Sequence, residues 1–314
     1  MKETLFYNHL CNDLIPFWNK MKDEENGGFY GYADEHGTAD RQSVKGTILN
    51  SRILWFYSAS YRLLKKEELL MMADHAYRFL AEHCFDSRYG GVFWSVNADG
   101  SPHEDIKHTY NQAFAIYALS VYYQASGKKE ALNLAYTLYR TIEEKCRDKE
   151  GYLEAFDRDF SPVSNEKLSE NGVIADRTMN TLLHVLECYT ELYRADRFSR
   201  VGNSIREILQ IFKSKIYNPD KKICEVFFDK NYKSIIRLES YGHDIETSWL
   251  IDRACDVLGD AGCLEEMLPV INGLAEGAYR NGIDPVSHAM NNECENGTIN
   301  RKKVWWVQAE CVSK

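Results

Sequence analysis

The chain has 314 residues, of which 44% are hydrophobic and 13% aromatic, so it can bury the core of one large domain or of two ordinary ones. Its formal net charge of −9 argues against a nucleic acid or an anionic membrane surface as partner, because both repel an acidic protein. A membrane-spanning helix needs about eighteen consecutive apolar residues, and the sequence contains no such run. These features favour a small, neutral molecule as the binding partner.

The N-terminus and the cysteines both bear on cellular location. Residues 1–7 lack the basic and apolar regions of a secretory signal. Nine cysteines are scattered singly from Cys11 to Cys311, without a Cys-x-x-Cys pair. An odd, dispersed set of this kind favours reduced thiols over a disulfide framework. We therefore predict a cytoplasmic protein.

A short aromatic motif recurs along the chain beside turn residues. It first appears at residues 27–32, and altered copies follow at residues 90–94, 151–156 and 222–228, with a weaker copy at 286–293. Each copy has the β-branched and aromatic composition of a short strand. The copies lie about 60 to 70 residues apart, a period that indicates a repeat architecture.

Between these copies the hydrophobic pattern predicts pairs of helices. One helix of each pair is amphipathic, and these segments lie near residues 4–22, 68–86, 129–147, 199–216 and 264–281. The other is apolar on most sides, and these segments lie near residues 45–64, 108–126, 173–195, 242–259 and 301–314. A helix that is apolar on most sides must be buried on most sides. We therefore predict an all-α fold in which amphipathic outer helices surround buried inner helices, a double-ringed α/α barrel.

Polar and aromatic residues that interrupt the predicted inner helices are candidates for a central pocket. They are Arg52, Tyr110, Asn111, Asn180, His184, His243, Glu246, Trp305 and Trp306. Each alone could be a satisfied polar or packing residue of the core. Because all five inner helices carry such residues, one shared pocket is the favoured interpretation.

His243 lies in the first turn of its predicted helix. Gly242 gives a flexible entry, and Asp244 and Glu246 place negative charge where the helix dipole favours it. The helix N-terminus disfavours the imidazolium form of His243, whereas Glu246, one turn later, favours it. We therefore expect the pKa of His243 to stay near its usual value of about 6.5, which suits proton transfer at neutral pH.

The stretch Ser240-Tyr-Gly-His-Asp-Ile-Glu246 and eight others together resemble the N-acylglucosamine 2-epimerase family, and within it the cellobiose 2-epimerases. The other stretches are residues 15–19, 25–32, 51–57, 107–117, 154–158, 168–172, 178–184 and 304–310. The resemblance implies a single (α/α)6-barrel domain over residues 1–314, with short β-hairpins in its loops. It also implies reversible inversion at C2 of the reducing-end glucose of β-1,4-linked disaccharides, which converts cellobiose to glucosyl-mannose and lactose to epilactose.

The resemblance implies roles for particular residues. His243 would be an acid/base at C2, and His184 would assist ring opening or move protons near O1 and O5. Arg52 would stabilise the enediolate oxygen, because a fixed guanidinium meets charge as it develops. The implied substrate contacts are Asn180, Glu246, Tyr110, Glu293 and the stacking faces of Trp305 and Trp306. For the tryptophans core packing is the alternative, and for Trp305 it is the favoured one.

No metal or nucleotide cofactor is implied, and the sequence contains no His-x-x-x-His pair or other metal-ligand spacing. The implied partner is a small-molecule oligosaccharide, and an intact barrel is expected to be a monomer. The family pattern has six helix pairs, and its last pair carries a second acid/base histidine and a further tryptophan. Only five inner helices are predicted before Lys314. A chain that ended there is expected to have open apolar flanks and to convert cellobiose poorly.

Three alternatives stay open. The first is an N-acylglucosamine 2-epimerase or a mannose isomerase with the same barrel. The second is an α/α-barrel glycoside hydrolase, which needs two carboxylates and could draw on Asp157, Glu170, Glu246 and Glu293. The third is a sugar-binding protein without activity.

Overall fold

The computed structural model describes residues 2–167 and 172–313. Of the matching stretch 168–172, only Gly172 is described, and Glu170 lies outside the described residues. The chain forms two compact units. The first unit contains Met1–Lys145 and Phe156–Ser161, and the second contains Cys146–Ala155 and Pro162–Lys314. The single-domain organisation stays a prediction, and the two units are described in turn.

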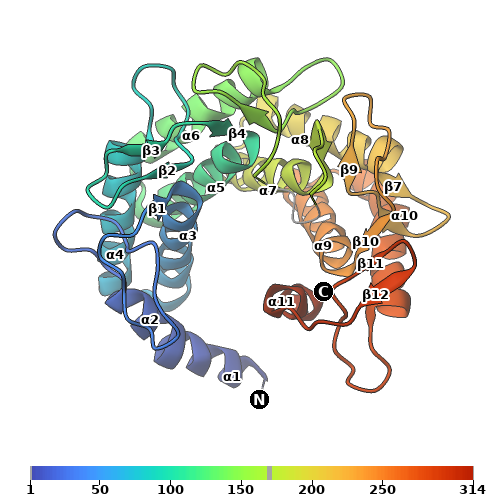
Figure 1. Cartoon of the computed structure of the whole chain (residues 1–314), viewed down its shortest axis with the longest axis horizontal. Helices are drawn as coiled ribbons and strands as arrows, with labels where there is room; N and C mark the ends of the chain where they lie inside the picture. Colours follow the sequence, from blue (N-terminus) through green and yellow to red (C-terminus); the bar gives the residue numbers. More distant parts are fainter. Residues whose placement is uncertain (1, 168–171, 314) are drawn as a thin grey trace. The chain divides into compact units, whose positions relative to one another are not determined.

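The first unit consists of helical hairpins (Figure 1). Its helices are α1 (Lys2–His9), α2 (Ile15–Lys20), α3 (Thr47–Leu64), α4 (Glu67–Phe79), α5 (Thr109–Ser126) and α6 (Lys129–Thr141). Helix α3 packs against α4 and α5, and α5 also packs against α6. Twelve of the 18 residues of α5 are buried, against five of 13 in α6. The predicted division into apolar inner helices and amphipathic outer helices is therefore confirmed here.

The second unit repeats this arrangement. Its helices are α7 (Met179–Asp196), α8 (Ser199–Ile211), α9 (Tyr241–Leu258), α10 (Ala261–Gly277) and α11 (Trp305–Ser313). Helix α7 packs against α8 and α9, and α9 also packs against α10 and α11. Thirteen of the 18 residues of α9 are buried, against six of 17 in α10. Helix α9 is thus enclosed by neighbours on several sides, as its apolar composition requires.

Recurrent signals set the helix ends. The predicted outer helices continue into π-helical turns, which are η1 (Leu10–Leu14), η2 (Leu80–Cys84), η3 (Ile142–Cys146), η4 (Phe212–Ile216) and η5 (Ala278–Gly282). Helices α5 and α9 end at Gly127 and Gly259, whose left-handed conformations glycine adopts without strain. The third inner helix begins at Met179 instead of residue 173, because the Thr178 hydroxyl caps it by accepting the Thr181 N–H.

Short antiparallel hairpins follow the π-helical turns. In four of the recurrent motifs the pairing partner directly follows a π-helical turn: Phe85 pairs with Val92, Arg147 with Tyr152, Tyr217 with Cys224, and Ile283 with Met290. In the first motif Lys22, which lies shortly after α2, pairs with Phe29. The described strands are β1 (Lys45–Gly46), β2 (Ser95–Val96), β3 (Pro102–Glu104), β4 (Lys107–His108), β5 (Ala155–Phe156), β6 (Arg177–Thr178), β7 (Tyr217–Asn218), β8 (Ile223–Cys224), β9 (Phe227–Phe228), β10 (Leu238–Ser240), β11 (Glu293–Glu295) and β12 (Thr298–Asn300). Strands β1, β4, β6 and β10 each lead directly into an inner helix. The hairpins therefore fix the first turns of these helices.

Ion pairs with a buried cation anchor three of these junctions. They are Lys45–Asp23 at 2.6 Å, Lys107–Asp86 at 3.1 Å and Arg177–Asp148 at 2.6 Å. Each carboxylate also accepts backbone N–H groups of its own hairpin turn. Burial by itself raises the pKa of Asp86, but hydrogen bonds from Arg158, the turn and Lys107 outweigh it and hold this pKa well below its usual range. A buried charge is tolerated at Asp86 because it is paired and hydrogen-bonded.

Candidate functional site

Two adjacent helices of the second unit each contribute one histidine. His184 lies on α7 and His243 near the start of α9, and these two helices pack against each other. Further along the same helices, Glu191 pairs with Arg253. The two imidazoles are close enough for His184 to lower the pKa of His243 by charge repulsion. The structure thus brings together two of the three predicted catalytic residues.

His184 is held by a carboxylate on its own helix. Its Nδ1 lies 2.9 Å from Glu187 Oε2, one turn away, and the side chains are only 8% and 13% exposed. Asn180 lies one turn before His184 on α7. The Oδ1 atom of Asn180 is buried and has no hydrogen-bond partner among the described residues. Because buried polar atoms are normally satisfied, this amide oxygen is available to a ligand hydroxyl.

His243 is half-buried and contacts a hydroxyl and an indole. Its Nδ1 lies 2.7 Å from Ser240 Oγ, and its ring centroid lies 4.9 Å from that of Trp306 on α11. Burial lowers the pKa of His243 to about 4, and the neighbouring His184 acts in the same direction. The expected pKa near 6.5 is therefore wrong. That expectation considered only the helix dipole and Glu246, whereas desolvation and the neighbouring His184 imidazole lower the pKa of His243.

Helix α11 places its two tryptophans differently. Trp306 packs against His243, and a Cβ atom on Gly242 would lie 2.7 Å from its ring, so this glycine makes room for the indole. Trp249 Nε1 donates a hydrogen bond to Glu310 Oε2 at 2.9 Å and ties α9 to α11. Trp305 is 79% exposed. Core packing, the favoured alternative for Trp305, is therefore wrong.

The remaining acidic candidates of the second unit lie on α9 and β11. Glu246 is buried on α9, one turn after His243. Glu293 on β11 is directly opposite Ser240 of β10, the residue that contacts His243, and accepts a hydrogen bond from Asn300 Nδ2 at 3.1 Å. Asp244 is also buried, and burial raises its pKa well above the usual value. Burial therefore disfavours the negative charge that was expected at Asp244.

The first unit holds the other two candidates next to each other. The Arg52 guanidinium lies over the Phe114 ring, 4.2 Å from its centroid, and the Tyr110 ring packs against Phe114 at 4.9 Å. Arg52 is exposed and has no ion-pair partner in the part of the chain that the structure describes. A guanidinium held over an aromatic ring keeps its N–H donors for another group. Asn111 donates to the Phe93 carbonyl at 2.6 Å, and its Oδ1 is buried without a partner among the described residues.

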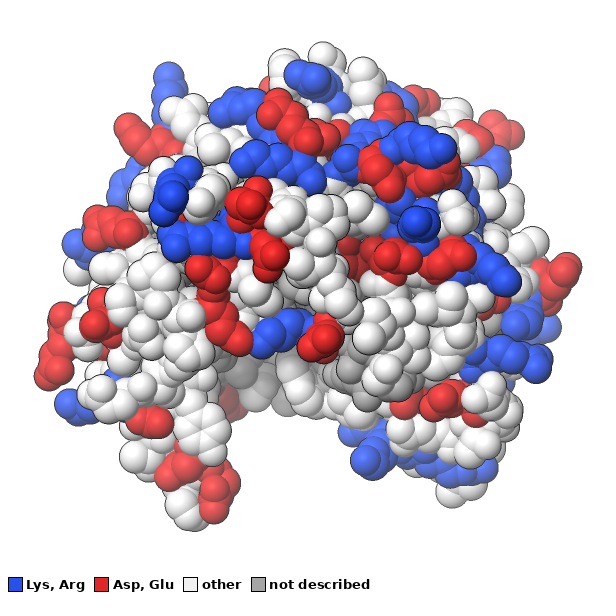
Figure 2. Space-filling view, turned by 45° about the horizontal axis from the view of Figure 1, so that its top comes forward, with Lys and Arg blue, Asp and Glu red and all other residues white. Residues whose placement is uncertain are grey.

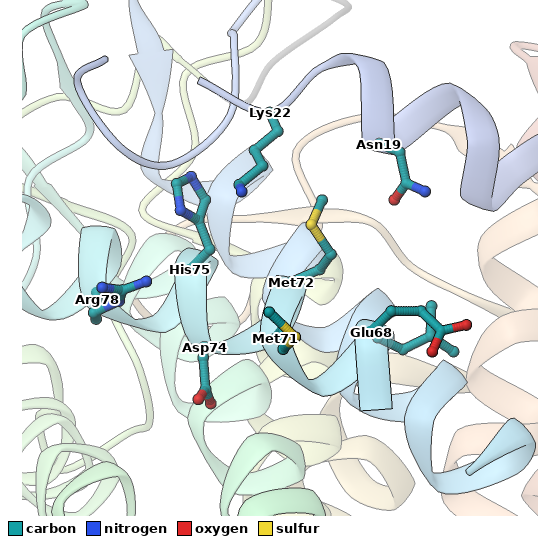
Figure 3. Close-up of a pocket in the computed structure, with 9 residues that line it drawn as sticks. Asn19, Lys22, Glu68, Met71, Met72, Asp74, His75 and Arg78 are labelled. Atoms are coloured by element: carbon teal, nitrogen blue, oxygen red, sulfur yellow. The ribbon is translucent and has the colours of Figure 1, made fainter. Parts of the chain in front are cut away.

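A separate pocket of about 420 Å³ lies on the first unit between α2 and α4 (Figure 3). Lys22 and His75 lie on the same side of it, and His75 Nε2 is 2.9 Å from the Gly28 carbonyl. Burial lowers the pKa of His75, which favours the neutral imidazole. None of the predicted site residues lines this pocket.

The surface in Figure 2 carries acidic and basic side chains interspersed with one another. Such mixing gives no extended patch of one sign on the face shown. Within residues 2–167 and 172–313, no helix has both the length and the hydropathy to cross a bilayer. The same residues contain no group of three His, Cys, Asp or Glu side chains placed to hold a metal ion.

Comparison with known proteins identifies the family. The model of the N-acylglucosamine 2-epimerase family matches residues 28–314. The chain belongs to the N-acylglucosamine 2-epimerase family. It is 49% identical to a cellobiose 2-epimerase of Eubacterium cellulosolvens, an alignment that covers 99% of this chain and 80% of that relative. The predicted assignment to an epimerase family of isomerases is thereby confirmed.

Solved structures of relatives bear out the fold. A sugar epimerase from a ruminal bacterium superposes with a TM-score of 0.96 and 47% identity, over 99% of this chain and 79% of that one. A D-mannose isomerase superposes with a TM-score of 0.82 over 98% of this chain and 78% of that one. At 18% identity this second likeness shows the fold alone. The predicted all-α fold of the α/α-barrel class is confirmed.

Several residues around the predicted site of this epimerase-family protein were not predicted. Glu187 could have been found, since a carboxylate three residues after a histidine shares its helix face. Ser240 precedes His243 by three residues and gave a similar signal. The roles of Gly242 and Phe114 depend on which helices pack together, so no local pattern could reveal them.

Proposed function

We propose that the protein catalyses reversible C2 epimerisation of the reducing-end glucose of β-1,4-linked disaccharides, with cellobiose and lactose as substrates. The main support is the pairing of His184 and His243 on adjacent helices, with an indole against His243. Paired imidazoles suit reversible proton transfer, and an indole face suits a sugar ring. The 49% identity to a cellobiose 2-epimerase supports the disaccharide as substrate class.

The proposed reaction moves only protons. Ring opening turns the reducing-end hemiacetal into a C1 aldehyde, which acidifies the C2 proton. A base removes this proton to give an enediolate, rotation about C2–C3 presents the opposite face, and an acid returns a proton to C2. Because the pKa of His243 is lowered to about 4, its imidazole is unprotonated at pH 7 and can accept the C2 proton. The reaction as written needs no redox or nucleotide cofactor.

The other residues keep the roles implied by the resemblance. His184 would assist ring opening near O1 and O5. The unpartnered amide oxygen of Asn180 supports a contact with a sugar hydroxyl. Arg52, which has no ion-pair partner among the described residues, is proposed to stabilise the enediolate oxygen. The remaining proposed substrate contacts are Glu246, Tyr110, Glu293, Trp305 and Trp306.

A substrate panel in deuterated water tests this proposal. Cellobiose, lactose, glucose, mannose and N-acetylglucosamine are each incubated with the protein, and C2 deuteration and products are followed by NMR. We expect deuterium at C2 of cellobiose and lactose, together with glucosyl-mannose and epilactose. Conversion of N-acetylglucosamine or of the monosaccharides alone would assign the alternative epimerase or isomerase activity. Release of glucose from cellobiose would indicate a hydrolase, and binding of cellobiose without deuteration would indicate a sugar-binding protein.

A further inference from the structure

The two histidines of the second unit differ in the group that their Nδ1 atoms contact. Nδ1 of His184 contacts the Glu187 carboxylate at 2.9 Å, whereas Nδ1 of His243 contacts the Ser240 hydroxyl at 2.7 Å. An ionised carboxylate only accepts hydrogen bonds, while a hydroxyl can donate or accept. The carboxylate therefore fixes where the proton of a neutral imidazole lies, and the hydroxyl does not.

The contact between Glu187 and His184 differs from an ordinary surface pair. His9 and Asp13 on the N-terminal helical segment make the same type of contact, Nδ1 to carboxylate at 2.8 Å, but their side chains are 56% and 66% exposed. Water screens such an exposed pair, so it holds a ring only weakly. The pair of His184 and Glu187 is almost entirely enclosed, where a charge-assisted hydrogen bond is stronger.

The neighbouring His243 makes this hydrogen bond matter for the shared proton chemistry. Two adjacent imidazoles do not readily carry a positive charge at the same time. Burial and His184 both disfavour the charged form of His243. The Glu187 carboxylate lies against His184, whereas His243 contacts only the neutral Ser240 hydroxyl at its Nδ1. The two rings therefore differ in whether a carboxylate or a neutral hydroxyl contacts Nδ1.

We infer that Glu187 is a positioning residue, which holds His184 with its proton on Nδ1 so that Nε2 is the atom that exchanges protons with the substrate. This role rests on the proposed function only for its catalytic consequence. The hold on the ring is a property of the sugar-free protein. Glu187 acts through His184 and needs no contact with the sugar.

Nitrogen-15 NMR of the histidine rings tests the inference together with kinetics on cellobiose. The variants are Glu187→Gln, which keeps size but removes the charge, Glu187→Asp, which keeps the charge, and Asp13→Asn as the matched exposed control. The His184 signals are identified by their loss in His184→Gln. We expect Nδ1 of His184 to be protonated in the wild type and in Glu187→Asp, and the Nε2–H form to appear in Glu187→Gln.

In Glu187→Gln we expect kcat to fall roughly 10- to 100-fold, part of what general acid–base catalysis supplies, with KM within about twofold. Glu187→Asp should recover part of this loss, and Asp13→Asn should leave kcat unchanged. A His184 ring that stays protonated on Nδ1 in Glu187→Gln, or an unchanged kcat, would overturn the inference. If the ring switches but the wild type exchanges no sugar proton, the hold of Glu187 on His184 stands and the proposed function fails.

Discussion

The junction before α3 and the junction before α9 occupy the same place in the repeat but are built from different residues. Before α3, the buried ammonium of Lys45 bonds Asp23 and the carbonyls of Gly27 and Ala98. Before α9, Glu239 stands at the position of Lys45 and Asn218 at that of Asp23. Strand β10 is paired with β11 over three residues, whereas β1 is paired with β2 over two. The junction before α9 therefore forms without the ion pair found before α3, and its backbone pairing is one residue longer.

The fourth residue of these inner helices shows the same contrast. Asn50 and Gln112 accept the N–H of Phe29 and of Val92, and Gln112 also donates back to the Val92 carbonyl at 3.0 Å. Asp244 accepts the Cys224 N–H at 2.8 Å, but its second oxygen is buried without a partner among the described residues. The Asp244 carboxyl group occupies the position of the Asn50 and Gln112 amides, which carry an N–H donor as well as an acceptor oxygen. This altered junction precedes the helix that carries His243.

The largest effect should come from breaking the ion pair on which the α3 junction depends. Lys45→Met leaves a buried Asp23 carboxylate without its counter-charge, because Lys45 is 0% and Asp23 1% exposed. We expect a loss of about 3–5 kcal/mol in the free energy of unfolding, measured with urea. Lys303→Met is the matched control, because Lys303 takes the same place before α11 but lies 4.0 Å from Asp284 and is partly exposed. Equal losses in the two variants would contradict the contrast between buried and exposed junctions.

A smaller effect is expected from closing the space at Gly242. In Gly242→Ala the new Cβ would meet the Trp306 ring at 2.7 Å and push it away from His243. Overpacking of this kind costs about 1–3 kcal/mol, and we expect kcat/KM for cellobiose to fall with it. Gly262→Ala in α10 is the control, since its Cβ would meet only ordinary contacts at 3.5 Å. An unchanged kcat/KM in Gly242→Ala would show that the position of the Trp306 ring is unimportant.

The smallest effect is a gain in stability from Asp244→Asn, which supplies an amide like those of Asn50 and Gln112 at the α3 and α5 junctions. Burial raises the pKa of Asp244, so the folded protein binds this proton more tightly than the unfolded chain. The carboxyl therefore costs stability increasingly as pH rises above its unfolded pKa of about 3.9. We expect the variant to match the wild type near pH 4 and to exceed it by about 1 kcal/mol at pH 7, in urea unfolding at both pH values. A variant less stable than the wild type at pH 7 would mean that the negative charge is needed.

The sequence predicted what depends on local periodicity. The helix pairs and the recurrent aromatic hairpins appear where the hydrophobic pattern places them, because burial of one face requires that pattern. Prediction from the sequence failed where the surroundings of a side chain in the folded protein determine its pKa or its exposure. The lowered pKa of His243, the raised pKa of Asp244 and the exposure of Trp305 depend on which helices enclose each side chain. Similarly, the start of α7 at Met179 depends on a capping hydroxyl at Thr178.

The central claim is that His243 transfers the C2 proton, and exchange of that proton with deuterated water measures this directly. We predict that His243→Ala abolishes deuteration at C2 of cellobiose while sugar affinity stays within about tenfold, because a transition-state group need not contribute to ground-state binding. His36→Ala, at a histidine whose side chain is 81% exposed, should leave exchange unchanged. Continued deuteration at C2 in His243→Ala, at the wild-type rate, would contradict the account.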